Sequence, residues 1–178
     1  MKKILIPLIV LFPVLLFAGE FPGGSATDFS LPTADGGRVT LSSLHGSPVL
    51  LNFIEKDDAV FGTFQIERNI QAQFSSRGVV VLTILVGDDA TRESAENLRD
   101  ALHLTHTVLY DEDGSVWGQY SHSSSTPLEI IVSSSGSIAY RTEGVDINSI
   151  SEKLSQLLSS GIQATTWWRI KELFRKGE

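Results

Sequence analysis

The sequence predicts an α/β protein in which a mixed β-sheet is flanked by helices, and three features carry this prediction. Two apolar runs, residues 49–54 and 79–86, have the near-continuous pattern of strands buried on both faces. Segments with apolar residues at three- and four-residue spacing separate the expected strands, as in strand–helix units. A closing hairpin over residues 128–141 adds an antiparallel pair. The chain has 178 residues, 42% hydrophobic and 20% charged, which suits one globular domain with short extensions.

The first expected element is a small β-hairpin that extends the domain on its N-terminal side. Phe29 and Leu31 alternate with polar residues, and so do Val39 and Leu41. The turn residues Asp35–Gly37 separate the two runs, which is the pattern of a hairpin.

The segment after the first buried strand predicts a helix over residues 59–76 that ends at Gly78, since glycine favours the left-handed conformation at helix ends. The apolar residues of this helix recur mostly at three- or four-residue spacing, at Phe61, Phe64, Ile66, Ile70 and Phe74. A second helix is expected to end at Leu102, with Thr91 as its N-cap, and residues 107–110 follow as a short strand.

The C-terminal part predicts a turn at Asp111–Gly114, a helical turn at residues 116–120, and two paired strands at 128–132 and 137–141. A final helix, capped by Gly161, has one apolar face formed by Ile147, Ile150, Leu154, Leu157 and Leu158.

This pattern divides the chain into a signal peptide (1–18), a flexible lead-in (19–27), the α/β domain (28–160) and an amphipathic C-terminal tail (161–178). Lys2 and Lys3 precede an apolar run, Ile4–Phe17, that is shorter than the roughly 20 residues of a spanning helix. Cleavage near Ala18 is therefore expected, and an uncleaved membrane anchor is the alternative.

The predicted signal peptide affects both the net charge of the mature chain and its expected location. Cleavage would remove two lysines and no acid, which changes the formal net charge from −7 to −9. An acidic chain does not favour nucleic acid as a partner. Because no cysteine follows the apolar run, a bacterial lipid anchor is excluded, and the expected location is the periplasm.

A family resemblance rests on short motifs that occur in one order along residues 23–158. The segment Ala26–Pro32 is similar to the opening A-P-D-F-x-L-P of redoxins, and the motifs that follow are Asp35–Gly46, Val49–Phe53, Arg77–Val81, Leu109–Gly114, Thr126–Val132 and Ser135–Gly144. Together they resemble the thioredoxin-like superfamily, in its redoxin, AhpC/TSA-like and TlpA/ResA-like branch. The resemblance implies a thioredoxin-like fold with a mixed central sheet, flanking helices and an N-terminal β-hairpin.

The chain differs from that family in having no cysteine. The resemblance implies that the two cysteine positions of the active site fall on Asp58 and Phe61. Thiol–disulfide exchange and peroxide reduction require a thiolate nucleophile, which neither residue can supply. The sequence therefore predicts a degenerate active site without catalytic residues and without thiol redox activity.

The resemblance also implies a cis peptide bond before Pro127, which packs against the active-site positions in the family. Thr126 and Pro127 would then face Asp58 and Phe61 and keep a peptide-binding groove. The alternative is that Pro127 only shapes the entry to the strand that follows.

Other candidate groups favour structural interpretations. Asp57 and Asp58 are expected to cap a helix N-terminus, with cation binding together with Glu55 as the less favoured alternative. The acidic turn at Asp111–Gly114 is interpreted as turn chemistry.

The histidines give no metal site in this interpretation. His103 and His106 straddle a helix end and are expected at the surface, and His45 and His122 are isolated in loops. No metal or cofactor is predicted.

These features predict a non-catalytic protein-binding module of the cell envelope, with a protein as partner. One alternative is an oxidoreductase-related enzyme or redox pathway component that relies on a partner's cysteines. A second alternative is a structural subunit of an envelope assembly. Trp167 and Trp168 in the tail could contact a membrane, pack back on the domain or dock to a partner.

Overall fold

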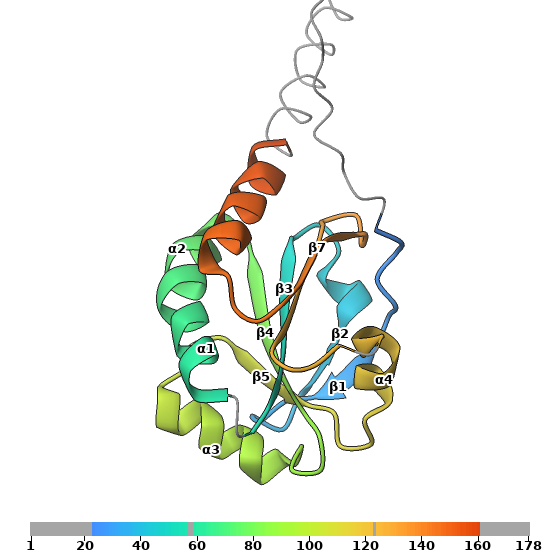
Figure 1. The fold of residues 1–178 in the computed structure, drawn as a ribbon, viewed down its shortest axis with the longest axis vertical. Coiled ribbons are helices and arrows are strands. Elements are labelled where there is room, and N and C mark those ends of the chain that lie inside the picture. Colours follow the sequence, from blue (N-terminus) through green and yellow to red (C-terminus); the bar gives the residue numbers. More distant parts are fainter. Residues whose placement is uncertain (1–22, 57–58, 123, 161–178) are drawn as a thin grey trace, which may run out of the picture.

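The computed structural model describes residues 23–56, 59–122 and 124–160. Its centre is a five-stranded sheet with the order β5-β4-β3-β6-β7. The strands are β3 (Val49–Glu55), β4 (Val80–Val86), β5 (Thr107–Tyr110), β6 (Leu128–Val132) and β7 (Ile138–Glu143). β3, β4 and β5 are parallel to one another, whereas β6 is antiparallel to both β3 and β7. The predicted mixed sheet is confirmed (Figure 1).

The predicted N-terminal hairpin is present as β1 (Ser30–Pro32) and β2 (Arg38–Thr40), which form a separate antiparallel pair. Gly36 adopts a φ of 86° in the turn, a conformation that glycine takes without steric cost. The Ala34 N–H donates to the Val108 carbonyl over 2.9 Å, so the hairpin lies against the edge strand β5. A short 3₁₀ helix, η1 (Leu41–Leu44), leads from the hairpin towards β3.

The helical segment after β3 is continuous but not uniform. It consists of α1 (Ala59–Ile66), the π-helical turn η2 (Glu67–Gln71), α2 (Ala72–Phe74) and the 3₁₀ turn η3 (Ser75–Arg77). Gly78 ends the segment in the left-handed conformation, with a φ of 87°, as the sequence predicts. The sequence does not predict the π-helical turn, because the apolar residues of this segment have the spacing of a regular α-helix.

The remaining helices also agree with the sequence pattern. In α3 (Arg92–Leu102) the Thr91 hydroxyl accepts a hydrogen bond from the Ser94 N–H, which confirms the predicted N-cap. The turn helix is α4 (Ser115–Ser121), and residues 147–160 form the last described helix. The predicted cap at Gly161 lies outside the described residues.

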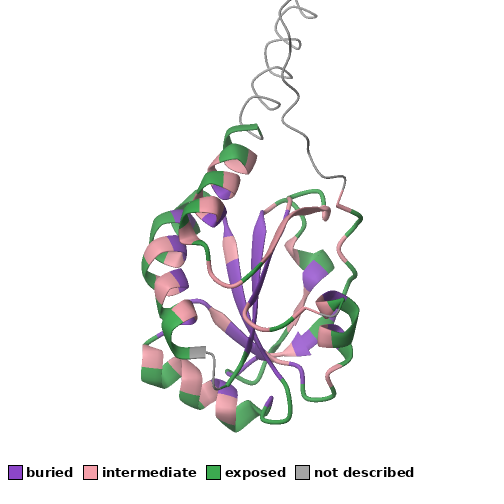
Figure 2. Ribbon diagram, in the orientation of Figure 1, coloured by how far each residue is buried: buried purple, intermediate pink, exposed green. Residues whose placement is uncertain are grey.

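Two layers of apolar side chains cover the sheet. One face packs against the hairpin and α4, with Phe29, Phe53 and Tyr120 in its core. The other face packs against α1, α2 and the helix at 147–160, with Ile66 and Ile150 in its core. Figure 1 shows these helices on opposite sides of the sheet, and Figure 2 shows that burial concentrates in the strands between them.

The segment boundaries predicted from the sequence lie partly outside the described residues. The signal peptide (1–18) and the C-terminal tail (161–178) with Trp167 and Trp168 belong to that part. Within the described part of the lead-in, the Ala26 N–H donates to the Gly136 carbonyl over 2.8 Å. Among the described residues, no helix has the length and apolar character needed to cross a bilayer.

Candidate functional site

The first component of the candidate site is the turn that enters β6. The Thr126–Pro127 peptide bond is cis, as the resemblance implies. Leu128, the next residue, pairs with Phe53 near the end of β3. The Pro127 carbonyl accepts a hydrogen bond from the Gly144 N–H over 2.7 Å, so the segment after β7 lies against this turn.

The second component is the start of α1, which carries Phe61. A Cβ atom built on the neighbouring Gly62 would lie 2.7 Å from Val145 Cγ2, so this helix approaches the segment after β7 closely. Val145 follows Gly144, the residue that donates to Pro127. The structure thus brings Phe61, Thr126 and Pro127 to one end of the sheet, whereas Asp58 lies outside the described residues.

The surface at the start of α1 is apolar and exposed. The exposed fractions are 75% for Phe61, 60% for Val60 and 38% for Phe64. The Arg68 guanidinium lies 5.5 Å from the centroid of the Phe64 ring, and extends this helix face by one turn. We refer to Val60, Phe61 and Phe64 as the α1 apolar face. Exposed apolar side chains that gather in this way are typical of interaction sites.

Beneath α1, buried polar side chains link β3, β4 and the residue before β5 to the helical segment. Asn52 of β3 donates through Nδ2 to Thr83 Oγ1 over 3.0 Å and to Thr63 Oγ1 over 3.3 Å. Thr83 Oγ1 also lies 2.8 Å from His106 Nε2, and His106 Nδ1 lies 2.7 Å from Glu67 Oε2. This chain of hydrogen bonds joins the sheet centre to η2 near the surface.

Glu129 of β6 is the most unusual member of this layer. It is fully buried, and neither of its carboxyl oxygens has a hydrogen-bond partner in the described part of the chain. Asn52, the residue opposite Glu129 on β3, keeps its Oδ1 atom without a partner as well. Burial raises the pKa of Glu129 well above its ordinary value.

Sequence reasoning did not identify this buried layer. The available signal is a polar residue inside an otherwise apolar strand, as at Asn52, Thr83 and Glu129. Register then decides that these three side chains lie in one row, because Asn52 pairs with both Thr83 and Glu129. No spacing rule within a single strand contains that information.

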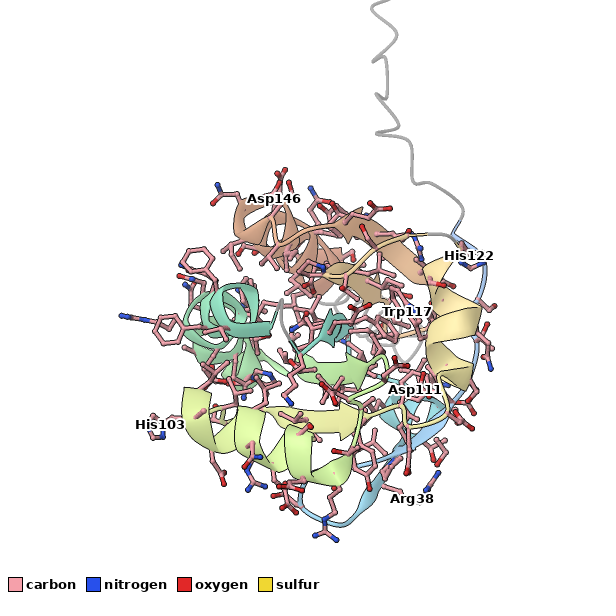
Figure 3. All side chains as sticks on the ribbon, turned by 60° about the horizontal axis from the view of Figure 1, so that its bottom comes forward. Arg38, His103, Asp111, Trp117, His122 and Asp146 are labelled. Atoms are coloured by element: carbon pink, nitrogen blue, oxygen red, sulfur yellow. The ribbon has the colours of Figure 1, made fainter. Side chains whose placement is uncertain are left out.

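The predicted surface position of His106 is wrong. His106 is 6% exposed because the start of β5 turns its ring inward towards Thr83. His103 is exposed and caps the end of α3 with a φ of 51°, and His122 lies on the opposite side of the molecule (Figure 3). Among the described residues, no group of three or more His, Cys, Asp or Glu side chains could hold a metal ion.

The acidic turn after β5 behaves as the sequence predicts. Asp111 Oδ2 accepts a hydrogen bond from the Trp117 N–H over 2.7 Å, and Asp113 Oδ1 accepts one from the Ser115 N–H over 3.0 Å. Gly114 takes the left-handed conformation at the start of α4. Figure 3 shows Asp111 beside α4, the helix that carries Trp117. These contacts are turn and helix-start chemistry.

Two hollows of the described domain lie away from the candidate site. One, of about 160 Å³, is bordered by the β6–β7 turn and η1, at the opposite end of β6 from Pro127. The other, of about 450 Å³, lies between the hairpin and α4. Neither is lined by α1, Thr126 or Pro127. The α1 apolar face therefore resembles a surface for a macromolecule more than the concave site of a small ligand.

The fold is thioredoxin-like. The structure is similar to a putative thiol:disulfide interchange protein DsbE from Chlorobium tepidum, with a TM-score of 0.67, 22% identity, and coverage of 77% of this chain and 97% of that chain. It is also similar to a putative protein disulfide isomerase from Bacteroides thetaiotaomicron, with a TM-score of 0.70, 21% identity, and coverage of 80% and 93%. At these identities the likeness shows the fold alone.

The family follows from the sequence comparison. The model of the AhpC/TSA family matches residues 22–141, and this chain belongs to that family. A putative peroxiredoxin bcp from Coxiella burnetii is 35% identical over 100 residues, which is 55% of this chain and 64% of that protein. The matched region thus spans less than two thirds of that relative. With no cysteine in its sequence, the chain is a degenerate member of the family.

Proposed function

We propose that this chain is a non-catalytic protein-binding module of the cell envelope that retains the family's substrate groove in a form without thiols. The observation that carries the proposal is the exposure of Phe61, 75%, where the resemblance implies an active-site cysteine. A phenylalanine held in solvent at the start of a helix contributes little to the fold. Its apolar ring gains most when a partner covers it.

The chemistry of the chain argues against turnover by the family's route. A thiolate attacks sulfur or peroxide oxygen in that route, and the chain contains no cysteine. Serine and threonine hydroxyls are hardly ionised near neutral pH, so they do not replace it. The groove positions Phe61, Thr126 and Pro127 can hold a partner but cannot exchange electrons with it.

The resemblance favours an extended polypeptide segment as ligand. The resemblance implies that the backbone before the cis proline pairs with the substrate backbone, and here that position is Thr126. An apolar side chain of the bound segment would then lie on Phe61 and Phe64. Burial of a phenylalanine ring at the centre of such a contact is worth about 2 kcal/mol, or roughly 30-fold in affinity.

The location in the envelope is a separate part of the proposal. It is supported by the two lysines and the apolar run before Ala18. A protein partner in the same compartment is expected.

Site-specific photo-crosslinking in cells tests the groove directly. A photoreactive residue replaces Phe61, and a matched control probe replaces Ser134, an exposed residue in the β6–β7 turn at the opposite end of β6. We expect one defined partner from the Phe61 probe and none from Ser134. Equal capture from both positions, or none from Phe61, would contradict the groove.

Two further measurements separate the alternatives. Phe61→Ala should weaken binding of the captured partner about 30-fold and leave the melting temperature unchanged, because the side chain is exposed. The purified protein, supplied with a dithiol, should turn over peroxide or disulfide no faster than the protein-free control. Turnover above that control would instead support an enzyme.

A further inference from the structure

Glu129 lies in the middle of the sheet face that α1 covers. Its neighbours in register are Asn52 on β3 and Thr142 on β7. Ile131, two residues further along β6, packs in the apolar layer beneath α1 and the helix at 147–160. Glu129 therefore shares a layer with apolar side chains, and it is fully buried.

The hydrogen-bond pattern around this carboxyl lacks a donor. Asn52 donates its amide hydrogens to Thr83 and Thr63, and its Oδ1 has no partner. Asn52 Oδ1 and the two Glu129 oxygens are thus three buried acceptors with no donor among the described residues. An ionised Glu129 would add a negative charge to a site that already consists of acceptors. A protonated Glu129 supplies the missing donor itself.

We propose that Glu129 is a buried proton-binding site that controls the docking of α1: the helix stays docked while the carboxyl is protonated, and loss of the proton opens this face of the sheet. The proton is held between Glu129 and Asn52 Oδ1, directly or through one internal water molecule. The site is a regulatory element that lies directly under the α1 apolar face.

The groups that face Glu129 from each surrounding element do not compensate a charge. Asn52 on β3, Thr142 on β7 and Thr63 on α1 are uncharged. The apolar layer around Ile131 contains Tyr140 of β7, and it contains Ile150 and Leu154 of the helix at 147–160. The nearest titratable pair of the buried layer, Glu67 and His106, is connected to Glu129 only through Thr83 and Asn52. Burial is the single cause of the raised pKa of Glu129.

Ionisation must therefore recruit water, and water can enter only if the covering helix moves. Thr63, between Phe61 and Phe64 in the sequence, is the point at which α1 is bonded to Asn52. The open state exposes Glu129 and restores its ordinary pKa of ~4.3. Above that pH, the equilibrium constant for opening should rise about tenfold per pH unit until Glu129 also ionises in the docked state.

Amide hydrogen exchange of the full chain tests this coupling. The readout is the protection of the buried α1 and η2 amides, such as those of Ile66 and Ile70, corrected for the intrinsic exchange rate. From about pH 5 to about pH 8, above the ordinary glutamate pKa, their protection should fall about tenfold per pH unit. In Glu129→Gln, which mimics the protonated acid, this protection should no longer fall as the pH rises. Glu143→Gln, the same change at an exposed site on β7, should behave as wild type.

An equal pH dependence in wild type and Glu129→Gln would overturn the proposal, and so would its absence in wild type. A second measurement covers the case that Glu129→Gln does not fold. Carbon-13 NMR of the wild-type Glu129 carboxyl, assigned through its own backbone, should show no titration near pH ~4.3. If the Glu129 carboxyl instead titrated near pH ~4.3, as exposed glutamates do, that result would also overturn the proposal. Neither measurement needs a binding partner. Failure of this proposal can therefore be distinguished from failure of the proposed function.

Discussion

His106 and Glu67 form a hydrogen-bonded pair that fastens the long helix to the sheet. His106 Nδ1 lies 2.7 Å from Glu67 Oε2, and His106 Nε2 lies 2.8 Å from Thr83 Oγ1 on β4. Glu67 is the first residue of the π-helical turn η2, and it also accepts hydrogen bonds from Thr105. The irregular turn thus coincides with the place where the helix contacts the start of β5.

This pair predicts a loss of stability in mild acid. Burial lowers the pKa of His106 and outweighs the hydrogen bond and charge of Glu67, which raise it, so the pKa lies below its ordinary value of 6.5. Below pH 6.5 the unfolded chain binds a proton that the folded chain binds less readily. The contribution of His106 to the free energy of unfolding should therefore decrease as the pH falls from about 7 to about 5, by at most ~1.4 kcal/mol per pH unit, whereas the raised pKa of Glu129 contributes a slope of the opposite sign.

Urea denaturation at several pH values measures this slope. His106→Asn should lose this contribution, so its free energy of unfolding should rise relative to that of the wild type as the pH falls. His103→Asn is the matched control, because His103 is exposed and asparagine tolerates its left-handed conformation. Equal slopes in wild type and His106→Asn would show that other groups cause the pH dependence.

A second prediction concerns the core on the opposite face of the sheet. Phe53 is fully buried, and its ring centroid lies 5.7 Å from that of Trp117 and 5.3 Å from that of Tyr120. Phe53→Ala should lower the free energy of unfolding by ~3–5 kcal/mol, since it removes apolar contacts and leaves a cavity. Urea denaturation followed by circular dichroism measures the loss. Val60→Ala, at a site that is 60% exposed, should change it by less than ~0.5 kcal/mol.

The sequence predicted much of this fold because the strands are strongly patterned. Apolar runs predict β3 and β4, and the alternation around Asp35–Gly37 predicts the hairpin. Thr91 and Gly78 marked one helix start and one helix end, since each has a local physical reason for its position. Local spacing does not predict the π-helical turn. The turn coincides with contacts of Glu67 to Thr105 and His106, which are distant in the sequence.

The candidate site was less accessible to sequence reasoning. Phe61 and Pro127 were found through a family pattern, and their placement at one end of the sheet depends on contacts of Gly62 and Gly144 that no motif encodes. The sequence alone does not single out Glu129, because the role of one polar residue in a strand depends on its neighbours, and these are known only once the strand register is known. His106 was misplaced for the same reason, since its partners are distant in the sequence.

A third prediction concerns the N-terminal segment, 1–18. If it is a signal peptide, the protein isolated from the cell envelope should begin near Gly19. Mass spectrometry of the intact protein measures this terminus. The control is a chain with Lys2 and Lys3 changed to glutamate, which should slow export, because a positive charge orients the segment. A mature protein that retains Met1 or Lys2 in the membrane fraction would instead support the uncleaved anchor.

The close approach of Gly62 to Val145 gives the sharpest test of the candidate site's architecture. Glycine to alanine inside a helix normally stabilises a protein by ~1 kcal/mol. At Gly62, however, the new Cβ would lie 2.7 Å from Val145 Cγ2, which is too close for two carbon atoms. Gly62→Ala should therefore push α1 away from the segment that holds Pro127 and destabilise the protein by ~1–3 kcal/mol.

A double-mutant cycle with Val145→Ala isolates this contact. In the Val145→Ala background the Cγ2 atom is absent, so Gly62→Ala should no longer destabilise and should recover the ordinary gain of alanine. Gly118→Ala in α4 is the matched control, because a Cβ there would meet nothing within 4 Å, and it should stabilise by ~0.5–1 kcal/mol. Urea denaturation of the wild type and these variants gives the coupling energy. A coupling near zero would mean that α1 and the segment after β7 do not touch at this point.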